Sequence, residues 1–390
     1  MPKRLHELAL PKGNITPDCE ICGKKATTKC EECRVTHYCG QEHKQVDAIS
    51  FHKTVCDKMK YIKAEHLLPF TETDRIALEE NIMKTKQEVM SIAETTTRKW
   101  LLERKPVNAY PSAMICWNMA CEMESPNSEE VILPICQVAE VFLKLGETEA
   151  ATEYMVQASW ISQNYETLPP VVLAKLHRLR GIVLMANKKW SEARRSFAEF
   201  VYITAVEYGI TNIRMGIPYG LLGVSLLKLG NVPGAMASFH KMADKWLDFL
   251  LSQFKEKLMR TATENDMAND KNIQELEFQY LEGKFVFEQM YEVVRGIPMH
   301  PETDLINFKI LCFQAMCRIR EGIPKDSIVF KEEALVAATR TRQDSAVSNS
   351  CVSLLTEVLG EDYLLKWDKK NKRPRTVATK YLEKIQAINV

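Results

Sequence analysis

Eight potential metal ligands lie within residues 19–56, and no other feature restricts the fold of this chain as strongly. They are Cys19, Cys22, Cys30, Cys33, Cys39, His43, His52 and Cys56. Their spacing, C-x2-C-x7-C-x2-C-x5-C-x3-H-x8-H-x3-C, forms four close pairs, and each pair fits within one tight turn or one turn of helix. Zinc takes four thiolate or imidazole ligands in a tetrahedron. The cluster therefore predicts two structural zinc ions.

The predicted zinc sites are closed. Catalytic zinc sites use three protein ligands and keep one position open for water or substrate, whereas here all eight ligands are needed for two complete sites. We expect a module that folds only with its metal. His37 lies between the ligands, but the pattern is complete without it, so we expect it not to bind metal.

The pattern resembles the MYND zinc finger, including Tyr38 before Cys39 and a helix-like stretch over residues 40–56. In that family the ligand pairs interleave. The resemblance implies one zinc on Cys19, Cys22, Cys39 and His43, and a second on Cys30, Cys33, His52 and Cys56. Many MYND fingers carry Gln directly after the sixth ligand and Trp five residues after it, and both help to form a peptide groove. This chain has Lys44 and Ala48 there, which counts against binding of proline-rich peptides.

Composition sets wider bounds. The chain has 390 residues, a formal charge of +1 and 46% hydrophobic residues, enough apolar material for sizeable cores. The near-neutral balance argues against nucleic acid as a partner. No apolar run is long enough for a membrane span, and the first residues lack the apolar segment of a secretory signal. Six cysteines outside the zinc cluster are expected to be buried, reduced thiols: Cys116, Cys121, Cys136, Cys312, Cys317 and Cys351.

A repeat of 42 residues follows the finger. Small and bulky residues recur as Ala139, Ala151, Met155, Ala158, then Gly181, Ala193, Phe197, Phe200, then Gly223, Ala235, Phe239, Met242. The turn positions Gly146, Lys188 and Gly230 keep the same step, and a degenerate copy precedes them at Thr97, Trp100, Ala109, Ala113 and Cys116. Such a pattern resembles the tetratricopeptide (TPR) repeat, whose stacked helix pairs bury a shared core. The sequence predicts a mostly α protein, a MYND finger followed by a TPR-like solenoid.

The expected organisation has five parts. An N-terminal arm covers 1–18 and the finger covers 19–56. TPR-like repeats cover 74–260, at about 90–130, 132–170, 174–212 and 216–255, and degenerate helical repeats cover 271–360. A basic linker (366–375, KWDKKNKRPR) and a short helix lie within 361–390. The basic segment is either a solubilising linker or a contact for an acidic surface, such as the tails of tubulin or nucleic acid.

Motifs for enzyme chemistry are missing from the sequence. MYND fingers also occur in SET–MYND lysine methyltransferases, but no SET signature of the Asn-His-x-Cys-x-Pro-Asn type is found. Phosphate-binding, dinucleotide-binding and nucleophile-elbow motifs are absent as well. We therefore expect a protein that is not an enzyme.

The order of finger and long-period repeats, without a SET domain, resembles the axonemal MYND–TPR proteins. This resemblance implies cytoplasmic and cytoskeletal localisation in a cilium or flagellum. It also implies partners among axonemal proteins, including another TPR protein and subunits associated with inner dynein arms. Predicted anchors for a partner on the first helices of the repeats are Gln137, Glu140, Arg178 and Tyr219. The alternative is a nuclear or cytosolic recruiter whose finger binds peptides of transcriptional regulators.

Overall fold

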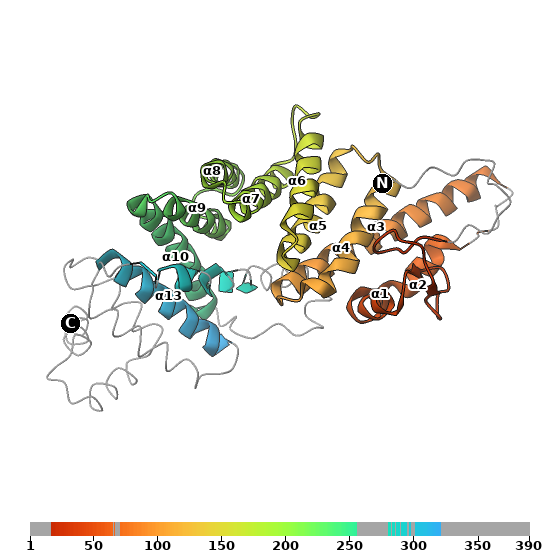
Figure 1. Ribbon diagram of the computed structural model, residues 1–390, viewed down its shortest axis with the longest axis horizontal. Helices are drawn as coiled ribbons and strands as arrows, with labels where there is room; N and C mark the ends of the chain where they lie inside the picture. Colours follow the sequence, from red (N-terminus) through yellow and green to blue (C-terminus); the bar gives the residue numbers. More distant parts are fainter. Residues whose placement is uncertain are drawn as a thin grey trace. The chain divides into compact units, whose positions relative to one another are not determined.

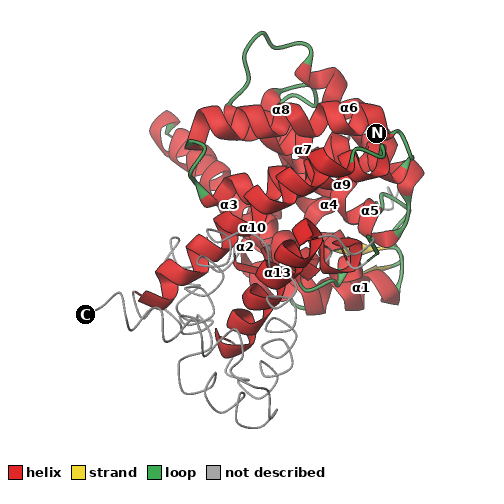
Figure 2. Cartoon of the chain, turned by 90° about the vertical axis from the view of Figure 1, so that its left-hand side faces the viewer, coloured by secondary structure: helices red, strands yellow, loops and turns green. Residues whose placement is uncertain are grey.

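The computed structural model describes residues 17–64, 66, 71–255, 280–297 with gaps at 282, 285, 289 and 295, and 301–320. The chain divides into two compact units, residues 1–200 and 201–390. Helix dominates the described residues (Figures 1 and 2). None of the described helices combines the length and apolar character that a membrane crossing requires. The basic segment and the helices expected after residue 321 lie outside the described residues, as does Cys351.

The finger is built from two short strands and a broken helix. Strands β1 (Thr28–Lys29) and β2 (His37–Tyr38) pair antiparallel, with Thr28 opposite Tyr38. Helix α1 (Gln41–Asp47), the π-helical turn η1 (Ala48–His52) and helix α2 (Lys53–Lys63) follow as one continuous helical segment. This agrees with the helix-like stretch expected over residues 40–56.

Each of the first two cysteine pairs is closed by a residue in the left-handed conformation. Gly23 follows Cys22 with φ of 69°, and Arg34 follows Cys33 with φ of 62°. The amide of Gly23 donates to the carbonyl of Cys19 at 2.9 Å, and the amide of Arg34 donates to that of Cys30 at 3.2 Å. These matching turns point the two thiols of each pair to the same side of the chain. Glycine reaches this conformation without a steric cost, which accounts for Gly23.

Four helix pairs make up the body after the finger. They are α3 (Glu72–Leu102) with α4 (Pro106–Met123), α5 (Ile132–Leu145) with α6 (Thr148–Ser162), α7 (Pro170–Ala186) with α8 (Trp190–Tyr208), and α9 (Gly216–Lys228) with α10 (Val232–Lys255). The 3₁₀ turns η2 (Glu129–Val131) and η3 (Ile213–Met215) precede α5 and α9, and α13 (Pro301–Arg320) lies later in the chain. In the first unit, α3 packs on α4, α4 on α5, and α5 on both α6 and α7 (Figure 1). Within the first unit, the helix pairs form a solenoid-like stack.

The first helix of every pair ends in the same turn. A left-handed residue stands at Arg104, Gly146, Lys188 and Gly230, with φ of 60°, 87°, 60° and 78°. The next amide then donates to the carbonyl five residues earlier: Lys105 to Trp100, Glu147 to Phe142, Lys189 to Leu184 and Asn231 to Leu226, at 2.9 to 3.0 Å. This is the bond of a Schellman motif, which satisfies carbonyls at a helix end. The identical step of 42 residues confirms the repeat, including its degenerate copy.

Small residues of the first helix face aromatic residues of the second. A Cβ added to Gly181 would lie 2.3 Å from the ring of Phe197, and one added to Gly223 would lie 2.5 Å from the ring of Phe239. Both rings are almost completely buried. The degenerate copy keeps the pattern, because Thr97 and Ala113 are also buried. The small residues at this position of each repeat therefore allow the two helices of a pair to pack closely.

The second unit has a separate aromatic core. Trp246 of α10 is buried between Gly216 and Gly283, where an added Cβ would lie 2.3 Å and 2.4 Å from its ring. The rings of Phe287 and Phe313 stack with centroids 3.9 Å apart. Helix α13 begins at Pro301. The proline is accommodated because the first position of a helix needs no amide donor.

The described cysteines outside the finger are free thiols, and most of them are buried. Cys116, Cys136, Cys312 and Cys317 are buried free thiols, and Cys121 is half-buried. Burial raises the pKa of the Cys116 and Cys136 thiols to about 12, so both stay protonated at neutral pH.

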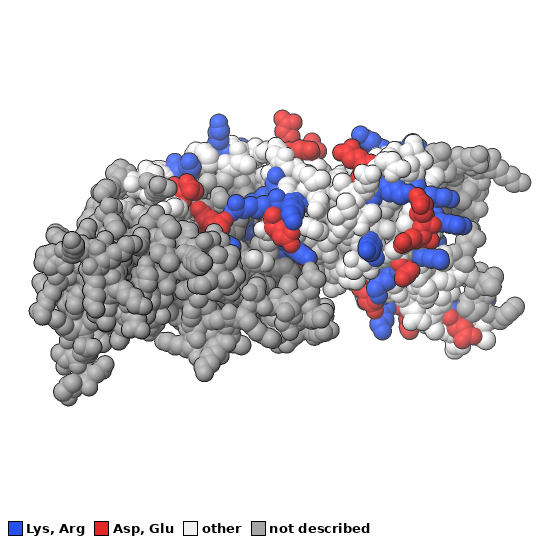
Figure 3. Space-filling model, turned by 90° about the horizontal axis from the view of Figure 1, so that it is seen from below, with Lys and Arg blue, Asp and Glu red and all other residues white. Residues whose placement is uncertain are grey.

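On the face drawn in Figure 3, Lys and Arg side chains intermix with Asp and Glu. No single-sign patch stands out among the described residues of that face.

Candidate metal centre

The ligands of the first set come from three short segments of the finger. The ligand atoms of Cys19, Cys22, Cys39 and His43 lie within 4.8 Å of one another. The Cys22 and Cys39 sulfurs are 3.6 Å apart, and Nδ1 of His43 lies 3.4 Å from the Cys39 sulfur. Zinc–sulfur bonds of about 2.3 Å place two tetrahedral ligands about 3.8 Å apart. These atoms therefore fit the edges of one zinc tetrahedron.

The second set is buried. Cys30, Cys33, His52 and Cys56 place their ligand atoms within the same 4.8 Å limit. The Cys30 and Cys56 sulfurs are 4.0 Å apart, and Nε2 of His52 lies 3.6 Å from the Cys33 sulfur. The two sets interleave along the chain as the sequence implied, and His37 belongs to neither. Each set would hold one zinc ion in a closed Cys3His site.

The environment of the finger shifts the pKa values of several ligand thiols. Burial raises the pKa of the Cys22 thiol to about 11 and that of Cys56 to about 12. Burial also acts on Cys19, but hydrogen bonds from the Cys22 backbone and from His43 outweigh it and lower its pKa to about 7. Zinc binds thiolates, so loading releases protons and weakens as the solution becomes acidic. The Cys22 and Cys56 thiols are therefore protonated at neutral pH unless a metal ion displaces their protons.

A comparison with known families agrees with this geometry. The family model described as the MYND finger matches residues 19–56. This segment is a MYND finger. The family model matches the segment from the first ligand, Cys19, to the last, Cys56, and both zinc sites have a complete set of ligands.

Lys44 and Ala48, the two unusual positions noted in the sequence, lie in α1 and η1 of the finger. Lys44 donates to Glu31 at 2.9 Å, so its ammonium group is engaged with the loop between the second cysteine pair. Ala48 is exposed and carries only a methyl group. The two positions at which the resemblance leads us to expect an altered peptide groove thus carry an engaged ammonium group and an exposed methyl group.

The MYND finger is joined to the first helix pair by an apolar contact. Phe51, Val55 and Met59 project from η1 and α2 at four-residue intervals and are buried. They form one cluster with Val89 and Ala93 of α3 and with Ile115, Cys116 and Met119 of α4. Each such side chain contributes about 1.5–3 kcal/mol when fully buried. The finger and the α3–α4 pair therefore share a core.

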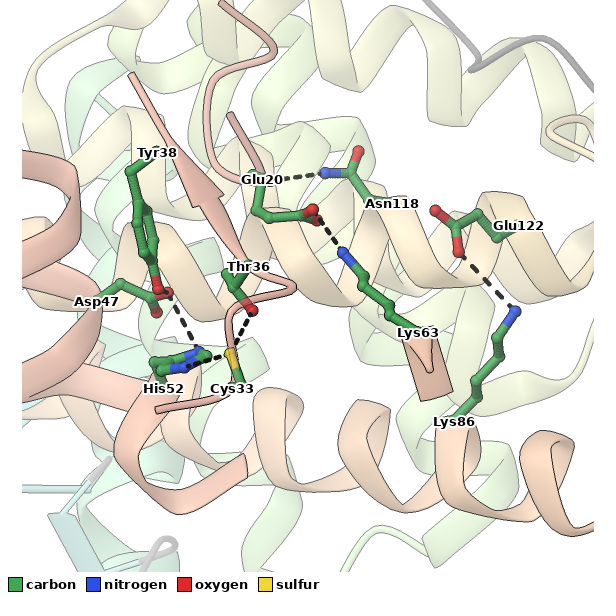
Figure 4. A network of polar contacts seen from close by, with 10 residues as sticks. All are labelled: Glu20, Cys33, Thr36, Tyr38, Asp47, His52, Lys63, Lys86, Asn118 and Glu122. Carbon is green, nitrogen blue, oxygen red and sulfur yellow. Dashed lines mark hydrogen bonds and ion pairs between the residues drawn. The ribbon is translucent and has the colours of Figure 1, made fainter. Parts of the chain in front are cut away.

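Polar bonds fix the register of this junction. The indole Nε1 of Trp100 donates to the carbonyl of Ser50 at 3.0 Å. The side-chain amide of Asn118 donates to the carbonyl of Glu20 at 3.0 Å, and the Glu20 carboxylate pairs with Lys63 (Figure 4). Around the first zinc site, the ring of His43 meets Tyr110 of α4 edge to face at 6.3 Å. Contacts thus reach from both zinc sites to the helical body.

Replacement of Trp100 tests the junction. Trp100→Phe keeps an aromatic ring but leaves the Ser50 carbonyl without its donor, which costs about 1–3 kcal/mol for a buried group. Trp160→Phe is the matched control, because Trp160 is 53% exposed on α6 and its change should cost less than about 0.5 kcal/mol. Urea unfolding of the two variants gives the difference. Equal loss of stability in both would contradict this account of the junction.

Three of the four predicted partner-binding residues come together. Gln137 and Glu140 lie on α5, and Arg178 on α7 pairs with Glu140 at 3.5 Å. The buried Oε1 of Gln137 has no hydrogen-bond partner. Beside them Lys175 pairs with Glu94 of α3 at 3.1 Å. Tyr219 belongs to the second unit, where the Lys241 ammonium lies 5.2 Å from the centre of its ring.

The polar residues of the junction carry no signal in the sequence. Trp100 fits the core of a repeat and Asn118 belongs to no motif, although both bond to the finger. The apolar residues do carry one: Phe51, Val55 and Met59 recur at the interval of a buried helical face. A finger whose last helix has such a face needs an apolar partner.

Proposed function

We propose that this protein is a non-enzymatic scaffold whose helix pairs bind a segment of a partner protein and whose MYND finger closes one end of the helical stack. A stack of helix pairs exposes the apolar surface of its terminal pair unless a capping element covers it. Phe51, Val55 and Met59 of the finger occupy that surface of α3 and α4. The shared core is the observation that carries the proposal.

The partner surface we favour is the side of α3, α5 and α7 that carries Glu94, Gln137, Glu140, Lys175 and Arg178. Its ion pairs are partly exposed, so a partner can reach them. Interfaces gain specificity from a few such anchors rather than from area alone. Tyr219 is a candidate for a separate contact in the second unit.

We further propose that the scaffold serves the axoneme of a cilium or flagellum. The support is the resemblance to axonemal MYND–TPR proteins: a MYND finger followed directly by 42-residue repeats. The partners expected from it are axonemal proteins, including another TPR protein and components linked to inner dynein arms. Tubulin is a candidate ligand of the basic segment 366–375, which lies outside the described residues.

Proximity labelling in ciliated cells tests the axonemal proposal. The full-length protein fused to a labelling enzyme is expected to mark axonemal neighbours, dynein-arm components among them. Transcriptional regulators in place of axonemal proteins would overturn the proposal. They would favour the alternative, a recruiter that binds peptides through its finger.

The recruiter has its own test. Lys44 and Ala48 remove features of the usual peptide groove, so the full-length protein is expected to bind proline-containing peptides on an array no better than scrambled ones. A set of tightly bound proline motifs would favour the recruiter.

Charge reversal tests the partner surface. Arg178→Glu places a carboxylate beside Glu140 and should reduce recovery of the labelled neighbours at least about tenfold, equivalent to about 1.4 kcal/mol. Glu192→Arg changes an exposed charge on α8, a helix that contributes no residue to this surface, and serves as the control. Both variants should melt within about 2 °C of the native protein if only binding is affected. If Arg178→Glu recovers the same labelled neighbours as the native protein, this surface is excluded as the partner-binding site.

A further inference from the structure

A chain of three buried polar groups leads from one zinc site of the finger to the other. The Tyr38 hydroxyl donates to Oδ2 of Asp47 at 2.8 Å, and the same oxygen lies 3.9 Å from Nδ1 of His52 (Figure 4). Tyr38, Asp47 and His52 are only 1%, 0% and 4% exposed. Tyr38 directly precedes the ligand Cys39 of the first set, and His52 is a ligand of the second.

The ring of His52 is oriented with one nitrogen on each side. Its Nε2 lies 3.6 Å from the Cys33 sulfur, so this nitrogen faces the metal position. Its Nδ1 faces Asp47 and has no hydrogen bond at the present distance. His43 of the first set is turned the other way, since its Nδ1 lies 3.4 Å from the sulfur of Cys39. The two histidines therefore offer different nitrogens to their metals.

A carboxylate behind a metal-binding histidine fixes the ring and its tautomer. In such arrangements the second ring nitrogen donates its proton to the carboxylate, which raises the basicity of the ligand nitrogen. A fully buried carboxylate is costly unless it is paired and hydrogen-bonded. Asp47 accepts a hydrogen bond from the Tyr38 hydroxyl, and the His52 ring lies next to it at 3.9 Å. No Lys or Arg ion pair to Asp47 is found within the described part of the chain.

We propose that Asp47 is a positioning residue for the second zinc site, and that Tyr38 extends this support to the first site, so that the two zinc ions are held jointly. Asp47 orients the His52 ring with Nε2 toward the three sulfurs of its set. The Tyr38 hydroxyl holds Asp47, and the backbone of Tyr38 continues into Cys39. Movement of Asp47 is thereby transmitted to a ligand of each site.

Zinc release from the full-length protein tests the proposal. Asp47→Asn preserves the shape of the side chain but removes the carboxylate that faces Nδ1 of His52. The affinity for one of the two zinc ions is expected to fall roughly 10- to 100-fold, measured in competition with a chromogenic chelator. Tyr38→Phe should weaken retention in the same direction, and at both sites. Asp18→Asn is the matched control, because this finger carboxylate pairs with Lys25 at 3.0 Å and is partly exposed.

Ring 15N chemical shifts distinguish positioning from simple loss of structure. In the native protein His52 is expected to show a metal-bound Nε2 with a protonated Nδ1, and His43 a metal-bound Nδ1. Asp47→Asn should move the His52 signals while His43 stays metal-bound. If Asp47→Asn does not fold, Asp47→Glu and Tyr38→Phe supply the same measurements.

Two results would overturn the proposal. One is native zinc retention and native His52 shifts in folded Asp47→Asn. The other is equal loss of both ions together with unfolding of the finger in every variant, which is what a purely structural role predicts. Loss confined to the second site in Tyr38→Phe would overturn the link between the sites.

Discussion

Removal of zinc from the full-length protein is expected to lower its thermal stability by more than the loss of a small independent domain would. Structural zinc contributes about 10–16 kcal/mol in zinc-finger peptides, so the finger should unfold when the metal is withdrawn. Phe51, Val55 and Met59 then leave the core that they share with α3 and α4. With each burial worth about 1.5–3 kcal/mol, the first unit should melt roughly 10 °C or more lower.

Differential scanning calorimetry with and without a high-affinity chelator measures this effect. Zinc added back in excess should restore the original transition, while magnesium should not. A control with chelator already saturated by zinc separates metal removal from chelator binding. An unchanged main transition accompanied by loss of a minor one would mean that the finger folds apart from the helices.

The second large effect is expected from the aromatic ring at the centre of a helix pair. Phe197→Ala removes a buried ring of α8 that packs against Gly181 of α7, and should cost about 3–5 kcal/mol. Tyr202→Ala on the same helix removes a side chain that is 66% exposed, and should cost less than about 0.5 kcal/mol. Urea unfolding followed by circular dichroism gives both values.

The partner of that ring provides a further check on the packing. Gly181→Ala adds a methyl group where the Phe197 ring lies, and should cost about 1–3 kcal/mol. Combining it with Phe197→Leu should cost less than the sum of the separate changes, because the smaller side chain makes room. Strict additivity would show that the two positions are not in contact.

Local and periodic features of this protein could be predicted from its sequence. Ligand spacing is sufficient to predict two zinc ions, because a short turn brings the two ligands of each pair together. The assignment of the pairs to the two ions came from the resemblance to the MYND finger. The period of 42 residues also places Gly146, Lys188 and Gly230 at equivalent turns, where all three adopt the left-handed conformation. Lys188 shows that the turn does not depend on glycine alone. Arg104 extends the same turn to the copy that the sequence shows only weakly.

Long-range contacts could not be predicted in the same way. The bond from Trp100 to Ser50 joins residues 50 positions apart, and that from Asn118 to Glu20 joins residues 98 apart. Neither pair has a spacing that signals contact. Asp47 illustrates a different difficulty, because a carboxylate on a short helix is usually exposed. Its burial arises only when β2 and η1 close over it.

Hydrogen–deuterium exchange of the full-length protein, with zinc and after its removal, tests most directly whether the finger and the first helix pair form one structural unit. We predict that zinc removal abolishes protection in residues 19–63 and also lowers it sharply in α3 and α4, around Val89, Ala93 and Ile115. Protection in α9 and α10, which belong to the other compact unit, should change little. Loss of protection confined to residues 19–63, with α3 and α4 as protected as before, would contradict the account.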